Sequence, residues 1–271
     1  MRQKLGQHFL KNKNILKEEV AALDLKDGET VIEIGSGRGA LTHATCNMKH
    51  ETRILAIERD PKLVEFLKDE FRENKNVEIV EGDVLKVLPS MIQDSRFRIQ
   101  DYKIIGNIPY YLTGYLLRTI GELKYKPEVC VFIIQKEVAE RMAAKPPKMN
   151  KLAASVQFWA KPEILRLVSR KDFSPPPEVE SALVRLETWN MKHGAEERGK
   201  IGKIEEKNYY KAVNVLFQQP RKTILNNLAE GQDDKISKEE LSERLKTIGI
   251  DPKSRPQDLS VEDIVNIAKL F

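Results

Sequence analysis

The stretch Asn107-Ile108-Pro109-Tyr110 combines residue types that could hold a nucleobase. It lies between two apolar runs, YKIIG and YLTGYLL. The side-chain oxygen of Asn107 and the backbone carbonyl of Ile108 are hydrogen-bond acceptors, and Pro109 stiffens the backbone beside them. Tyr110 offers a flat ring on which a base can stack, an interaction worth roughly 1–3 kcal/mol per base.

This combination suits methyl transfer to the exocyclic amine of adenine. The lone pair of that nitrogen is delocalised into the ring, so the amine is a poor nucleophile. Asn107 and Ile108 would supply acceptors for its two N–H groups, and proximity and oxygen dipoles would supply the rate gain. No strong general base is needed, because the proton becomes acidic as the methyl arrives. The alternative is an ordinary turn, opened by Gly106-Asn107 and shaped by Pro109.

A glycine-rich segment follows the first predicted strand. In VIEIGSGRGALT, Gly35, Gly37 and Gly39 let the backbone turn tightly and approach a ligand. Gly35, Gly37 and Ala40 also satisfy the dinucleotide fingerprint G-x-G-x-x-G/A, with Glu58 about twenty residues further on. At this point a nicotinamide cofactor is an open alternative.

Three acidic residues at three successive strand ends favour S-adenosylmethionine over a dinucleotide. Glu33 precedes the glycines, where a carboxylate would repel a pyrophosphate but tolerate a cationic sulfonium. Glu58 could accept from both hydroxyls of a ribose, and Asp83 of EGDVL could accept from an adenine amine. Each acid could instead cap the helix that follows its strand.

The elements that must position these residues alternate along the chain. Short runs rich in β-branched residues predict buried strands at 29–35, 53–58, 77–82, 102–107 and 129–135. Amphipathic stretches lie between them, such as 61–74, where a proline suits the first helical turn. This alternation predicts an α/β fold with a largely parallel sheet, whose carboxyl edge carries the candidate site.

The pattern changes toward the C-terminus. Two strand candidates, 163–169 and 181–187, follow one another without a helix and predict an antiparallel hairpin at the sheet edge, joined by FSPPPEVE. The segment MKHGAEERGKIG then predicts a linker, and only helical patterns follow it. We therefore expect a catalytic domain with a basic N-terminal arm at 1–189 and a small all-α domain at 190–271.

The expected helices of the second domain have recognisable ends. Ser237 with Glu240 and Ser260 with Asp263 predict N-terminal caps. Gly249 predicts the end of the third helix.

Charge favours a polyanionic partner. The 271 residues carry a net charge of +5, and the first seventeen contain five basic residues and no acid. KPPKMNK at 145–151, Arg221-Lys222 and the basic residues of 166–171 add further clusters, which favours nucleic acid over solvated faces.

The remaining composition excludes other classes of protein. No apolar run approaches the roughly 18 residues of a membrane span, and the N-terminus lacks the apolar core of a secretory signal. The two cysteines and four histidines show no ligand spacing, so we expect no metal site. Free cysteines in apolar surroundings fit a reducing cytoplasm.

A set of motifs in a fixed order resembles the rRNA adenine dimethyltransferases, the kasugamycin-resistance family. The motifs are GQHFL, EIGSGRGALT, the acid at 58, EGDVL, GNIPYYLT, QKEVAERM, FSPPPEVESALVRLE and QQPRKTILNNL. The resemblance runs from residue 4 to the C-terminus. It implies a Rossmann-like class I S-adenosylmethionine-dependent methyltransferase fold. It also implies dimethylation of two adjacent adenosines near the 3′ end of small-subunit rRNA.

The resemblance also implies roles for individual residues. The residues expected to contact the cofactor are His8, Leu10, Gly35, Gly37, Glu58, Asp83 and Asn107. The residues expected at the reacting base are Asn107, Ile108, Pro109, Tyr110 and Phe173. Many relatives have Asn where His8 stands, so a main-chain contact is expected there. Phe173 would stack on the base opposite Tyr110, and its alternative role is to anchor the loop in the core.

The expected partners are small-subunit rRNA and the immature small ribosomal subunit, with a role in its assembly. The KPPKMNKL loop and the N-terminal arm would contact RNA. We expect a monomer, because a rigid RNA target does not require symmetry. One alternative is a DNA adenine methyltransferase, against which Ile108 and the small second domain argue. Another is a non-catalytic assembly or transcription factor, against which the intact acids and Asn107 argue.

Overall fold

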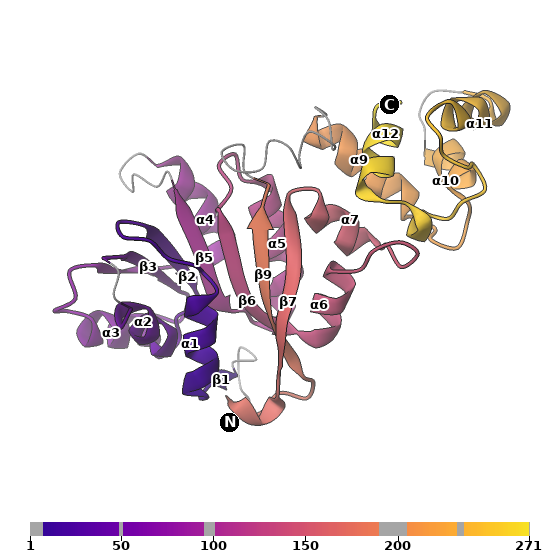
Figure 1. The fold of residues 1–271 in the computed structure, drawn as a ribbon. Coiled ribbons are helices and arrows are strands. Elements are labelled where there is room, and N and C mark those ends of the chain that lie inside the picture. The colour runs from indigo at the N-terminus through magenta and orange to yellow at the C-terminus, as the bar shows by residue number, and fades with distance from the viewer. Residues whose placement is uncertain (1–7, 49–50, 95–100, 190–204, 232–235, 271) are drawn as a thin grey trace. The chain divides into compact units, whose positions relative to one another are not determined.

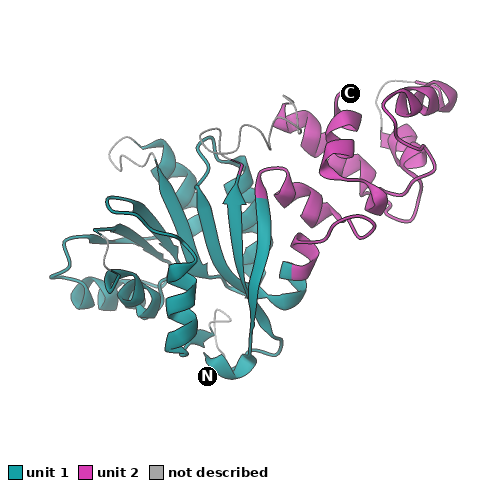
Figure 2. Cartoon of the chain, viewed as in Figure 1, with its two compact units in different colours: residues 1–139, 161–188 teal, residues 140–160, 189–271 magenta. Residues whose placement is uncertain are grey.

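The computed structural model describes residues 8–48, 51–94, 101–189, 205–231 and 236–270. The chain divides into two compact units, residues 1–139 with 161–188 and residues 140–160 with 189–271 (Figure 2). The predicted linker, 191–202, lies outside the described residues, as do the first seven residues of the basic arm.

The first unit is built on a seven-stranded sheet with the order β4-β3-β2-β5-β6-β9-β7 (Figure 1). The strands are β2 (Thr30–Ile34), β3 (Arg53–Glu58), β4 (Val77–Glu81), β5 (Tyr102–Asn107), β6 (Val129–Gln135), β7 (Ala160–Val168) and β9 (Ser181–Thr188). Strands β2 to β6 pair in parallel, whereas β9 pairs antiparallel with β6. The predicted α/β fold with a largely parallel sheet is confirmed, and β9 and β7 form its edge.

The strand order creates a ligand crevice between β2 and β5. From β2 the chain proceeds outward to β3 and β4, then returns to the other side of β2 for β5 and β6. Connections that diverge in this way leave a crevice at the carboxyl ends of the two central strands. Gly106 lets β5 run close to β2, because a Cβ there would lie 2.6 Å from the carbonyl oxygen of Ile34.

Helices connect these strands and bury their apolar faces. They are α1 (Lys13–Ala21), α2 (Ala40–Cys46), α3 (Pro61–Glu70), α4 (Val84–Gln93), α5 (Thr113–Glu122) and α6 (Lys136–Met142). Asp60 caps α3 by accepting from the N–H of Lys62 at 3.0 Å, and Pro61 opens the helix as predicted. A core cluster joins apolar residues of α1 and α2 to Val31 and Ile105 of the sheet.

The second unit is helical, with α7 (Lys151–Gln157), α9 (Glu206–Leu216), α10 (Ile224–Gly231), α11 (Lys238–Thr247) and α12 (Val261–Ala268). The predicted helix ends are confirmed. The Oγ of Ser237 accepts from the N–H of Glu240, and Ser260 and Asp263 form a capping box. Gly249 follows α11 with φ 78°.

Residues 140–160 pack with the C-terminal helices, so the compact units differ from a division after residue 189. The ring of Phe158 stacks on that of Tyr209 at 3.9 Å between centroids. The hydroxyl of Tyr209 donates to the carbonyl of Ala154 at 2.9 Å. A local sequence pattern contains no signal for such long-range packing. The functional division into 1–189 and 190–271 stays a prediction.

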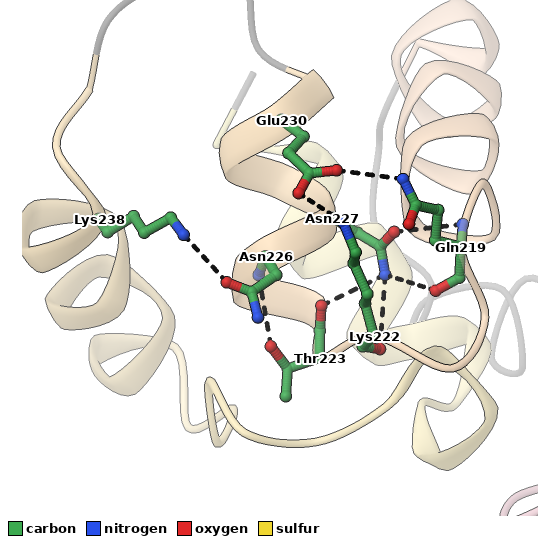
Figure 3. A network of polar contacts seen from close by, with 7 residues as sticks. All are labelled: Gln219, Lys222, Thr223, Asn226, Asn227, Glu230 and Lys238. Atoms are coloured by element: carbon green, nitrogen blue, oxygen red, sulfur yellow. Dashed lines mark hydrogen bonds and ion pairs between the residues drawn. The ribbon is translucent and has the colours of Figure 1, made fainter.

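A buried asparagine fixes the turn before α10 (Figure 3). The Nδ2 of Asn227 donates to the carbonyls of Gln219 at 3.1 Å and Thr223 at 3.2 Å, and its Oδ1 accepts from the N–H of Gln219 at 3.2 Å. In the same turn Lys222 pairs with Glu230 at 2.7 Å. Asn227 therefore supplies the partner of the Gln219 N–H and a second donor to the two carbonyls, which also accept from the main-chain N–H groups of Lys222 and Asn227.

The described residues contain no group of three or more His, Cys, Asp or Glu that could hold a metal ion. Over the same ranges, every helix is too short or too polar to cross a membrane. Cys46 and Cys130 are both free thiols, and Cys130 is buried.

Candidate active site

A cavity of about 310 Å³ opens at the carboxyl edge of the sheet. This volume suits a small ligand. The predicted site residues that line it are His8, Gly35, Gly37, Glu58, Asp83, Asn107, Ile108, Pro109, Tyr110 and Phe173. Leu10 is the predicted site residue that does not line it. The structure thus brings together segments from six separate parts of the sequence.

Asn107 ends β5, and its side-chain amide has a fixed orientation. Its Nδ2 donates to the backbone carbonyl of His8 at 2.7 Å. Because a carbonyl can only accept, the NH₂ end of the amide must face His8. The Oδ1 takes no hydrogen bond from any described residue. It is therefore the end of the amide that can accept from a ligand.

Ile108 and Pro109 continue the backbone along the cavity. The N–H of Ile108 donates to the carbonyl of Ile133 at 3.0 Å, which ties this segment to the end of β6. The side chain of Ile108 is buried. No described residue donates to the carbonyl of Ile108, so this oxygen is a second free acceptor. Pro109 limits the rotation of the following peptide.

Tyr110 presents its ring to the cavity while its hydroxyl is held. The hydroxyl lies 2.9 Å from the Oγ of Ser181 at the start of β9. Burial raises the pKa of Tyr110, although the hydrogen bond with Ser181 acts in the opposite direction. The ring of His8 lies 5.9 Å away between centroids.

A short two-stranded ribbon holds the N-terminal segment against the loop after β7. Strand β1 (Phe9–Leu10) pairs antiparallel with β8 (Phe173–Ser174). The Nδ1 of His8 lies 2.9 Å from the carbonyl of Pro175 and donates to it. On the other side, Asp172 accepts from the backbone N–H of Lys11 at 2.8 Å. The carbonyl of His8 therefore has a defined position above Asn107.

The pairing of β1 with β8 determines where Leu10 and Phe173 lie. The side chain of Leu10 joins the hydrophobic core beneath the ribbon and does not line the cavity, because alternate residues of a strand point to opposite faces. Phe173 is 1% exposed and belongs to the same core, yet it also lines the cavity. Phe173 thus packs in the core and lines the cavity at the same time.

The glycine loop and Glu58 form one hydrogen-bonded unit. The N–H of Gly37 donates to the Oε2 of Glu58 at 2.8 Å, and the Oε1 accepts from Arg59 and Asp60 at 2.7 and 2.9 Å. Three of the roughly four acceptor positions of the carboxylate are thus used. Gly37 has φ 59°, and a Cβ there would lie 3.0 Å from the ring of Phe9. A side chain at this position would meet both strain and a clash.

Asp83 caps a helix and lines the cavity at once. Its Oδ1 accepts from the N–H of Leu85 at 3.1 Å, which caps α4. Its Oδ2 lies 3.9 Å from the guanidinium of Arg59. Asp83 can therefore cap α4 with one oxygen and still offer the other oxygen to a ligand.

The prediction that the carboxylate of Glu33 faces the ligand and favours a sulfonium over a pyrophosphate is wrong. Its carboxylate does not line the cavity but is buried against α2, where the hydroxyl of Thr42 donates to it at 2.6 Å. Burial raises the pKa of Glu33 to about 7. Glu33 is the fourth residue of β2, so its side chain points away from the crevice. It cannot select against a pyrophosphate.

Comparison with known proteins decides the family. The whole chain, residues 1–271, matches the ribosomal RNA adenine dimethylases. The chain belongs to this family. It is 38% identical over 267 residues to a ribosomal RNA small subunit methyltransferase A of Dehalococcoides mccartyi (strain CBDB1), covering 97% of this chain and 85% of that one. A protein of the same name from Caldanaerobacter subterraneus subsp. tengcongensis is 34% identical, with 98% and 96% covered.

Solved structures confirm the fold of this dimethylase. A dimethyladenosine transferase from Plasmodium falciparum matches with a TM-score of 0.77 at 24% identity, over 96% of each chain. The 23S rRNA methyltransferase ErmE matches with a TM-score of 0.72 at 20% identity, over 96% of this chain and 98% of that one. The predicted class I methyltransferase fold and the predicted enzyme class, a methyltransferase, are both confirmed.

Several residues that line the cavity of this dimethylase were missed by sequence reasoning. They are Phe9, Ile34, Ile57, Arg59, Gly82, Val84, Leu85, Tyr111, Leu112 and Tyr115. The aliphatic residues at strand ends look like core residues in sequence. The two tyrosines could have been found, because their four-residue spacing puts them on one helix face.

Proposed function

We propose that this chain transfers methyl groups from S-adenosylmethionine to the exocyclic amines of two adjacent adenosines near the 3′ end of small-subunit rRNA. The observation that carries this proposal is the anchored amide of Asn107. Its donor end is held by the carbonyl of His8 at 2.7 Å, so its acceptor end is presented to the cavity.

The cavity offers the hydrogen-bond acceptors and the apolar surface that the proposed cofactor needs. Glu58 has an acceptor position left for a ribose hydroxyl, and the Oδ2 of Asp83 is left for an adenine amine. Ile34 and Ile57 line the cavity with apolar surface. When bound, S-adenosylmethionine supplies an electrophilic methyl on a sulfonium. Gly35 and Gly37 would let the main chain approach its amino-acid end.

The Asn107 segment would hold the substrate amine. The Oδ1 of Asn107 and the carbonyl of Ile108 accept its two N–H groups, which turns the nitrogen lone pair toward the methyl. Both oxygens stabilise the positive charge that develops on nitrogen. The rings of Tyr110 and Phe173 would stack on the base, and the bond from Tyr110 to Ser181 fixes one of them.

The expected partners are the rRNA and the immature small subunit. The basic loop 145–151, the N-terminal arm and the helical domain at 190–271 would supply sequence-independent phosphate contacts. The turn fixed by Asn227 presents the cation of Arg221, for which no described residue provides a partner. The enzyme would act as a cytoplasmic monomer and take part in subunit assembly.

The test uses the full chain with methyl-labelled S-adenosylmethionine and three substrates: immature small subunits without these methyls, naked rRNA and duplex DNA. The labelled nucleic acid is digested and its nucleosides are identified. Dimethyladenosine formed in the immature subunits is the expected result, and primer extension on the undigested RNA should stop at two adjacent adenosines. Preferential labelling of duplex DNA would identify a DNA methyltransferase. Cofactor binding without label in any substrate would identify a binding factor.

A further inference from the structure

Two exposed tyrosines lie at the mouth of the cavity and have no part in the chemistry described above. Tyr111 is 55% exposed and Tyr115 is 67% exposed, and both line the cavity. No described residue forms a hydrogen bond with either hydroxyl. Exposing this much aromatic surface is unfavourable for the free protein, so a contact that covers it would be favoured.

The local structure places the two rings on one face. Tyr111 lies in the 3-10 turn of Tyr110–Leu112, which runs directly into α5. Residues four apart in a helix lie on the same side. The opposite side of α5 carries the buried residues Leu116, Leu117 and Ile120. The tyrosine face is therefore turned away from the core and continuous with the cavity.

The surface around the rings is open and carries two exposed arginines. Gly114 lies between the two tyrosines, and a Cβ there would meet no atom within 4 Å. Arg59 lines the same cavity and lies 3.9 Å from Asp83, and Arg118 follows Tyr115 by three residues and pairs with Glu122 at 2.8 Å. Their side chains are 62% and 78% exposed, so both guanidinium groups can also reach a phosphate. Flat rings beside exposed arginine side chains are a combination that binds single-stranded nucleic acid.

A target of two adjacent adenosines makes a platform at this position useful. While one adenine occupies the cavity, its neighbour on the strand must lie at the mouth. We propose that Tyr111 and Tyr115 form a stacking platform for the nucleotide next to the one in the cavity. They are positioning residues, which hold the second adenosine while the first is methylated. This inference rests on the proposed function.

The test uses an RNA hairpin that carries the two adjacent adenosines, with 2-aminopurine in place of the one expected outside the cavity. The fluorescence of 2-aminopurine is quenched when it stacks. Binding of the full chain should quench it. The double variant Tyr111→Ala/Tyr115→Ala should lose the quenching and raise the KM of the hairpin by at least about fivefold, with a smaller change in kcat.

Two controls separate stacking from other effects. Tyr111→Phe/Tyr115→Phe keeps both rings and should restore quenching and KM. Tyr125 is also an exposed tyrosine of the first unit, at 54%, but does not line the cavity. Tyr125→Ala should therefore behave as the unaltered chain. The affinity for S-adenosylmethionine, measured by titration calorimetry, should be the same in all variants.

The outcomes distinguish this inference from the proposed function. Quenching that persists in the alanine double variant, or an equal loss in Tyr125→Ala, would overturn the platform. A change of oligomeric state in the double variant without a change in RNA binding would also overturn it and indicate a protein contact. If the unaltered chain methylates no adenosine, the proposed function fails, and the quenching still decides whether the platform exists.

Discussion

The side-chain amide of Asn107 donates to the main-chain carbonyl of His8 at 2.7 Å, across 99 residues of sequence. Through this bond the N-terminal segment sets the direction of the oxygen that the mechanism requires. The segment is itself held by β8 and by Asp172. The resemblance implied a cofactor contact for this segment, and the structure adds its contact with Asn107.

Removal of the N-terminal segment should impair catalysis itself. A variant beginning at Lys11 lacks the carbonyl of His8, so the amide of Asn107 is free to rotate. We expect kcat to fall roughly a hundredfold, which is the cost of losing an oriented polar group at a reacting centre. Steady-state kinetics on immature subunits would measure it.

The matched control for this truncation neutralises only charge. Arg2→Gln/Lys4→Gln should raise KM most at low salt, weaken the dependence of KM on salt and leave kcat within about twofold, because phosphate contacts act on binding. An unchanged kcat in the truncated chain, with its thermal unfolding intact, would show that His8 does not orient Asn107.

Substitution of Phe173 should distinguish its role in the core from its role in stacking on the base. Phe173→Leu keeps most of the buried volume, so the free energy of unfolding should fall by less than about 1.5 kcal/mol. The loss of a flat ring should weaken RNA binding by roughly 1–3 kcal/mol. Urea denaturation and RNA titration measure the two effects. Phe132→Leu, in a buried residue outside the cavity, should change stability alone. Equal RNA affinities in both variants would remove Phe173 from the site.

The stability of the first unit should fall as pH rises. Glu19 is buried without a hydrogen bond to either carboxylate oxygen, and burial and the nearby Glu33 raise its pKa. Glu33 has its pKa raised from 4.5 to about 7. The folded protein thus holds protons that the unfolded chain releases. The stabilisation is complete below pH 4.5 and is lost through pH 7 and above, by up to about 1.4 kcal/mol per pH unit for each proton.

Glu19→Gln removes a carboxyl group that titrates differently in the folded and the unfolded chain. The free energy of unfolding of this variant should therefore depend less on pH between 5 and 8.5. Urea denaturation at several pH values measures the slope. Glu18→Gln, at an exposed position paired with Arg166, is the control and should keep the original slope. A slope that is the same in Glu19→Gln as in the unaltered chain would contradict this prediction.

Asn227 should be worth more than its neighbour Asn226. Asn227→Ala leaves the N–H of Gln219 without a partner and removes the second donor to the carbonyls of Gln219 and Thr223, so we expect the second unit to lose about 1–3 kcal/mol of stability. Asn226 accepts from the exposed Lys238, so Asn226→Ala should cost less than about 0.5 kcal/mol. Thermal unfolding of both variants tests this, and equal losses would contradict it.

Local sequence patterns predicted the secondary structure, the helix caps and the residues at strand ends. The alternation of strands and helices, the caps at Ser237 and Ser260, and the strand-end positions of Glu58, Asp83 and Asn107 all follow from residues near one another in sequence. The acids lay at the expected edge because parallel strands end together.

What the sequence could not supply depends on side-chain direction and distant pairing. The direction of Glu33 follows from the pleat of β2, in which a shift by one residue reverses the face. The ribbon of β1 and β8 pairs residues more than 160 positions apart and contains two residues on each side, too few for a pattern. The packing of Phe158 on Tyr209 likewise has no local signal.

The central claim is that Asn107 holds the amine of adenine, and one measurement tests it most directly. Single-turnover methyl transfer to immature small subunits is compared between the unaltered chain and Asn107→Ala, with cofactor and RNA affinities measured in parallel. We predict a loss of at least about a hundredfold in the rate constant, with both affinities within a few-fold. An unchanged rate constant would contradict the account, because no other side-chain amide lines the cavity within the described residues.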